Sequence, residues 1–142
     1  MRLATFSYEG QVRIGVLDPL ENLLTDLSSI APHLPKNMSS LIVLGVDGLN
    51  EVKKTLEKAD QDNQIPIDKV TLNAPIWPPV RDPFAVGRNY HEHAKEFHDS
   101  GFDATSGSKA VPDHPIIFTK ATTSVTGPFD PVPAHLDKTN TT

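Results

Sequence analysis

Cysteine is absent from the 142 residues, which excludes disulfides, thiol nucleophiles and thiolate metal sites. Basic residues are also few, because 13 lysines and arginines face 18 aspartates and glutamates, for a formal net charge of −5. The basic residues are scattered and form no stripe that would neutralise a run of phosphates. We therefore expect no nucleic-acid partner.

Long apolar runs are missing as well. No segment approaches the roughly 18 apolar residues that a membrane-spanning helix needs. The first residues reach Glu9 before any apolar run of the secretory type develops. These absences predict no membrane partner and a cytoplasmic protein. The hydrophobic share of 37% allows a core of modest size.

The sequence begins with the pattern of a β-hairpin. Residues 2–8 and 11–17 are rich in strand formers, and the second segment alternates, with Val12, Ile14 and Val16 on one face. Glu9-Gly10 between them supplies the glycine that a tight turn requires.

Helical spacing follows the hairpin. Between residues 49 and 62 the apolar positions recur every three or four residues, at Leu49, Val52, Leu56 and Ala59. Asp47 stands where a carboxylate would accept from the free amides of a first turn. We predict a helix over 49–62, with Asp47 as its N-cap, packed on the hairpin.

Proline divides the chain. Five prolines lie between residues 65 and 83, and each removes a backbone donor. We predict a small N-terminal α/β domain over 1–72, a proline-rich connector over 73–83, and from 84 to 142 the beginning of a β-rich second domain. Residues 84–86 and 116–118 are its expected strands, and 99–113 is an expected loop. The predicted fold class is α+β.

The densest group of titratable side chains follows the first of these strands, from Arg88 to His98. If the stretch is helical, His93 and Glu96 share a face, and the carboxylate can orient the imidazole as a general base. An ordinary solvated helix face is the alternative. A second alternative makes His91, His93 and His98 metal ligands, although two residues two apart on a helix point in nearly opposite directions.

The string from Val86 to Glu96 resembles the Gly-x-Asn-Tyr-x-x-His-x-x-Glu signature of the fumarylacetoacetate hydrolase family. Downstream, Pro115 to Lys120 resembles the family's Pro-x-x-Phe-x-Lys segment, and Gly127-Pro128 the turn after it. The hairpin and the connector fit the N-terminal domain that many members carry. The resemblance spans nearly the whole chain.

The resemblance implies a metal-dependent hydrolase, lyase or isomerase acting on a small 2-oxo or 1,3-dicarbonyl acid, and a homodimer when full length. His93 and Glu96 would be the catalytic dyad that deprotonates water or substrate. Lys120 would lie near the site, and Arg88 would clamp a substrate carboxylate or form a surface ion pair. A Mg²⁺ or Mn²⁺ ion would stabilise the developing enolate.

The sequence departs from the family pattern at the metal. The family's Glu-x-Glu pair and later Asp have no counterpart before Thr142, and we expect the cation ligands beyond the end of this chain. None of the remaining aspartates has a partner on the same face of a strand; they are Asp99, Asp103, Asp113, Asp130 and Asp137. We therefore expect the chain alone to be inactive. The rival hypothesis is a non-catalytic truncated module that pairs with a full-length relative.

Overall fold

The computed structural model describes residues 1–101 and 113–131. The chain divides into two compact units, one formed by Met1–Pro79 with the segment from Val125 onward, the other by Val80–Ser124. The division after Pro79 lies inside the proline-rich segment. The domain limits expected from the sequence, at 72, 83 and 84, stay predictions, and each unit is described by itself.

The predicted hairpin is confirmed. Strands β1 (Arg2–Tyr8) and β2 (Gln11–Asp18) pair antiparallel from Arg2↔Leu17 to Tyr8↔Gln11. The two turn residues both have positive φ, 49° at Glu9 and 74° at Gly10. This is the backbone of a type I′ turn, whose twist matches that of the strands it joins.

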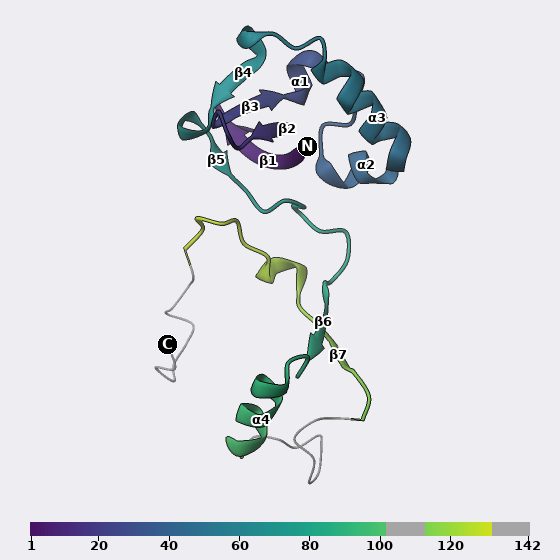
Figure 1. The fold of residues 1–142 in the computed structure, drawn as a ribbon, viewed down its shortest axis with the longest axis vertical. Coiled ribbons are helices and arrows are strands. Elements are labelled where there is room, and N and C mark those ends of the chain that lie inside the picture. Colours follow the sequence, from purple (N-terminus) through teal and green to yellow (C-terminus); the bar gives the residue numbers. More distant parts are fainter. Residues whose placement is uncertain (102–112, 132–142) are drawn as a thin grey trace. The chain divides into compact units, whose positions relative to one another are not determined.

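Three short strands extend the hairpin into a five-stranded antiparallel sheet. They are β3 (Leu23–Asp26), β4 (Gln64–Pro66) and β5 (Thr71–Leu72), and the order is β4-β3-β2-β1-β5. Figure 1 shows the sheet with α1 (Leu27–Ile30), α2 (Met38–Val43) and α3 (Gly45–Leu56) beside it. The 3₁₀ turns η1 (Gln61–Asn63) and η2 (Ile67–Lys69) flank β4.

The helix expected over 49–62 is placed differently. Helix α3 spans Gly45–Leu56, its N-cap position is Leu44, and no side chain caps it. The prediction of Asp47 as N-cap is therefore wrong; Asp47 lies inside the first turn, where its charge suits the helix dipole. The cause is Gly45, whose φ of 57° turns the chain from α2 (Met38–Val43) directly into α3.

The core of the first unit lies between the sheet and these helices. Val52 of α3 and Leu27 at the start of α1 (Leu27–Ile30) are buried in one cluster with Ile14 of β2. The expected packing of the helix and the hairpin around a common core is thus confirmed. Val12, predicted on the same apolar face as Ile14, is 57% exposed against 2% for Ile14.

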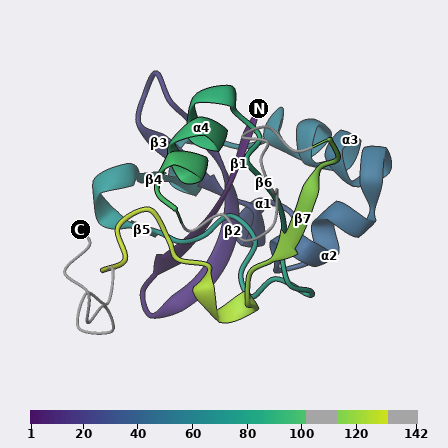
Figure 2. The same cartoon turned by 90° about the horizontal axis from the view of Figure 1, so that it is seen from below.

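The second unit joins a two-stranded sheet to one helix. Strands β6 (Phe84–Gly87) and β7 (Ile116–Thr119) pair antiparallel and lie side by side in Figures 1 and 2. Helix α4 (His91–Asp99) follows β6, and η3 (Thr122–Ser124) follows β7. Both predicted strands and the α+β class are confirmed. Residues 102–112 of the expected loop lie outside the described residues.

None of the helices in the described ranges is long and apolar enough to cross a membrane.

Candidate active site

The candidate site is built on the passage from β6 to α4. Gly87, the last residue of β6, pairs with Ile116, and Arg88 then adopts a left-handed backbone with φ 52°. Tyr90 is extended, and α4 begins at the next residue without a side-chain cap. Glu92 in the first turn carries a charge of the sign that favours the N-terminal end of a helix.

Helix α4 carries both residues of the expected dyad. His93 and Glu96 are three positions apart, so their side chains extend from the same side of the helix. Both are exposed. Within residues 1–101 and 113–131, no hydrogen bond or ion pair joins them. The helical placement confirms the predicted strand–turn–helix, whereas the role of the dyad stays a prediction.

The three histidines of α4 do not form a metal site in the part of the chain that the structure describes. His91 and His93 are two residues apart on a helix, so they project to different sides. More generally, no three His, Asp or Glu side chains converge within the described ranges.

Arg88, which lies between β6 and α4 in the chain, is largely buried. Its relative exposure is 9%, and its guanidinium carbon lies 4.8 Å from the centroid of the Phe97 ring. A left-handed backbone costs a residue other than glycine about 1–2 kcal/mol. A cation–π contact of this kind returns about 1 kcal/mol. The side chain of Arg88 thus offsets part of the strain of its own backbone.

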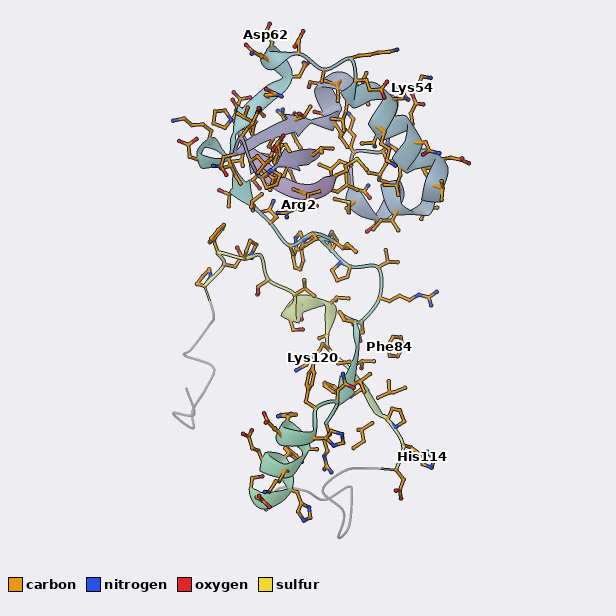
Figure 3. All side chains as sticks on the ribbon, in the orientation of Figure 1. Arg2, Lys54, Asp62, Phe84, His114 and Lys120 are labelled. Atoms are coloured by element: carbon orange, nitrogen blue, oxygen red, sulfur yellow. The ribbon has the colours of Figure 1, made fainter. Side chains whose placement is uncertain are left out.

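Lys120 extends from the other end of the β6–β7 ladder. Phe84 pairs with Thr119 at one end and Gly87 with Ile116 at the other, a span of about 10 Å along the strands. In Figure 3 the labels Phe84 and Lys120 mark the first end and His114 lies toward the second. Lys120 is exposed, its amide donates to the carbonyl of Pro83 at 2.9 Å, and its ammonium lies 5.4 Å from the Phe118 ring.

A small hollow lies at the Gly87 end of this ladder. It has a volume of about 210 Å³, and its polar lining comes from Arg88, Asn89, Asp113 and His114. This is the end of the strands from which the chain enters α4. The structure therefore groups Arg88, the hollow and the dyad helix around one turn, and puts Lys120 at the opposite end of the ladder.

Two residues of this unit were missed from the sequence. Phe97, the partner of Arg88, was not considered, although its position three after the buried Ala94 was a usable helical signal. Asp82 accepts a hydrogen bond from the amide of Thr122 at 3.1 Å and so joins the segments before β6 and after β7. No local sequence pattern predicts this hydrogen bond, because 40 residues separate Asp82 from Thr122.

Comparison with known proteins identifies similar sequences and a similar solved structure. The family described as fumarylacetoacetate (FAA) hydrolase C-terminal matches residues 83–141. The fumarylacetoacetate hydrolase from the psychrophile Exiguobacterium antarcticum, a solved structure, has a TM-score of 0.62 and 30% sequence identity, and the match covers 99% of this chain and 42% of that one. The chain belongs to the fumarylacetoacetate hydrolase family.

Two of the similar proteins are oxaloacetate tautomerases. A mitochondrial oxaloacetate tautomerase of Rattus norvegicus is 31% identical over 134 residues, which are 93% of this chain and 39% of that protein. An oxaloacetate tautomerase of Bacillus subtilis is 37% identical over 75 residues, which are 52% of this chain and 22% of that protein. The chain thus spans well under half the length of the relatives it matches.

Proposed function

We propose that this chain supplies the proton-transferring part of an enzyme that acts on a small 2-oxo or 1,3-dicarbonyl acid. The observation that carries the proposal is the placement of His93 and Glu96 on one exposed side of α4. When a hydrogen bond forms between the two side chains, Glu96 orients the imidazole of His93, and the other ring nitrogen takes the proton. The matching of residues 83–141 to the family supports it.

The reaction that the relatives' names favour is a keto–enol conversion, since two of them are oxaloacetate tautomerases. In that step His93 removes a proton from the carbon beside the 2-oxo group. The electron pair of the broken C–H bond forms the enolate, and a proton returned to its oxygen completes the enol. Hydrolysis of a carbon–carbon bond differs in that the same base activates water. Of these two reactions, we propose the tautomerase reaction for the enzyme to which this chain contributes.

The residues described here do not by themselves form a site for the Mg²⁺ or Mn²⁺ ion that the family resemblance implies, because no three suitable side chains converge among them. The cation, with ligands beyond this chain, is part of the proposal. So are a small 2-oxo acid as substrate, a homodimer, and a cytoplasmic location. Lys120, which is exposed, is proposed to face negative charge of the substrate. No observation favours the non-catalytic module.

The proposal is tested in a chimera, because the chain covers 42% of the Exiguobacterium antarcticum protein. This chain is joined to the part of that protein beyond the match, and decay of enol-oxaloacetate absorbance is measured with Mn²⁺ present. We expect His93→Ala to lower kcat by about 10²–10⁴-fold, the usual contribution of a general base. Glu96→Gln should lower it less, because the imidazole remains.

The matched control is His91→Ala, which removes an exposed imidazole from the same helix on a different side. Its kcat should stay within about twofold, since a surface substitution of this type disturbs little. A chimera that turns over substrate equally well with His93→Ala would refute the proposed role of α4.

A further inference from the structure

We propose that Arg88 is a positioning residue for the His93–Glu96 helix, acting through Phe97, and that it does not clamp a substrate carboxylate. The inference rests on the proposed function for the meaning of the dyad. Its structural part, the anchoring of α4 by Arg88, stands independently on the geometry of Val80–Ser124.

Arg88 lies where the chain passes from β6 into α4. It is the residue directly after the last ladder pair, Gly87↔Ile116, and three residues before α4 begins. Its left-handed backbone, φ 52°, changes the direction of the chain at this point. Such a conformation persists in a residue with a Cβ only where the surroundings hold it. The side chain of Arg88, 9% exposed and stacked on Phe97, is a contact that can do so.

Helix α4 is too short to be stable on its own. The helix has nine residues and no side-chain cap at Tyr90. Isolated helices of fewer than about 12 residues are marginal in water. Tertiary contacts therefore have to hold it, and among the described residues these include the burial of Ala94 and the stack between Phe97 and Arg88.

Phe97 lies next to the dyad along α4. Phe97 follows Glu96 directly and lies four residues after His93, one helical turn away. A contact that holds the Phe97 ring consequently limits rotation of α4 about its axis. The directions in which His93 and Glu96 project are limited with it.

Clamping a substrate would require the guanidinium of Arg88 to be accessible to a carboxylate. A bidentate clamp offers both guanidinium nitrogens to an incoming carboxylate. At 9% exposure, with one face over an aromatic ring, Arg88 presents little surface to such a group. Lys120, in contrast, is exposed.

The anchoring is tested first by amide hydrogen exchange of the 142-residue chain. Arg88→Ala removes the guanidinium but keeps the Cβ, so the strain of the left-handed backbone is unchanged, and Phe97→Leu removes the ring. Each should accelerate exchange of the α4 amides by about fivefold, the equivalent of a cation–π contact worth about 1 kcal/mol. The double variant should accelerate exchange by less than the product of the two single effects, and β1 and β2 should be unaffected.

The control for loss of charge is Arg81→Ala, because Arg81 is exposed and lies in the same unit. It should leave α4 exchange unchanged. Unaltered exchange of α4 in Arg88→Ala would overturn the anchoring, and so would fully additive effects of Arg88→Ala and Phe97→Leu.

Kinetics of the chimera then separate positioning from clamping. Positioning predicts that Arg88→Ala and Phe97→Leu each lower kcat by about 10–100-fold with KM nearly unchanged, as expected for a displaced catalytic pair. Phe97→Tyr, which keeps an aromatic face, should retain kcat. A clamp predicts a large rise in KM for Arg88→Ala and no effect of Phe97→Leu; that pattern would refute the positioning role. An inactive unmodified chimera would count against the proposed function, whereas the exchange result would still decide the anchoring.

Discussion

The guanidinium of Arg13 donates a 2.7 Å hydrogen bond from Nη1 to Oδ2 of Asp26, a carboxylate with 3% exposure. The other carboxylate oxygen, Oδ1, accepts from the amide of Ser28 at 2.8 Å and from its hydroxyl at 2.7 Å. Asp26 thereby caps α1 and ties it to β2. A buried carboxylate is tolerated here because both of its oxygens have donors.

Replacing Arg13 leaves that carboxylate with Ser28 alone. We expect Arg13→Ala to lower the free energy of unfolding by about 2–3 kcal/mol, because an uncompensated buried charge is costly. Urea unfolding followed by far-UV circular dichroism and by the fluorescence of Trp77, the single tryptophan, measures it. The exposed Arg2 provides the control, and Arg2→Ala should cost less than about 0.5 kcal/mol. Equal stability of the two variants would contradict the argument.

Gly15 on β2 is required for packing. A Cβ at this position would lie 2.5 Å from the carbonyl oxygen of Thr25 and 2.6 Å from Cδ2 of Leu24. Since the carbonyl belongs to the backbone of a paired strand, relief requires the sheet to shift. We expect Gly15→Ala to cost about 1–3 kcal/mol, the range for an overpacked core, in the same unfolding experiment.

The control for Gly15 is Val12→Ala on the same strand, where the side chain is 57% exposed. Its cost should stay below about 1 kcal/mol, the span of strand propensity. A Gly15→Ala protein as stable as the parent would show that the strands separate more easily than their packing implies.

Limited proteolysis tests the division of the chain. Val80 is 82% exposed and Arg81 is exposed beside it, at the boundary between the two units. Trypsin should therefore cut early after Arg81 or in the predicted loop 99–113, and a fragment containing β1 to β5 should persist. Arg81→Gln should delay the first of these cuts. Primary cleavage after Arg13 would be inconsistent with the sheet.

Metal affinity can be measured on the chain by itself. A divalent cation such as Mg²⁺ takes several oxygen ligands in near-octahedral order, and the described residues offer no converging group of three. Titration calorimetry of the 142-residue chain with Mn²⁺ should show weak binding without a defined stoichiometry. In the chimera, one tightly bound ion per chain is expected. Tight stoichiometric binding by the 142-residue chain would mean that it holds ligands not recognised here.

Local patterns allowed several elements to be predicted. The β1–β2 hairpin follows from alternation around a two-residue turn, and β6, α4 and β7 follow from apolar runs around a polar cluster. In contrast, β4 and β5 are three and two residues long and exist only because they pair with β3 and β1. Strands this short carry no periodicity of their own.

The sequence by itself determined that His93 and Glu96 lie one turn apart on a helix after a strand, because both relationships depend on neighbours in the chain. Only the tertiary structure decided that α3 begins at Gly45, that Gly15 has no room for a side chain, and that Arg88 stacks on Phe97. These three features depend on the backbone conformation at single residues and on which strands and helices come into contact. Such contacts form between residues whose spacing in the sequence has no fixed period.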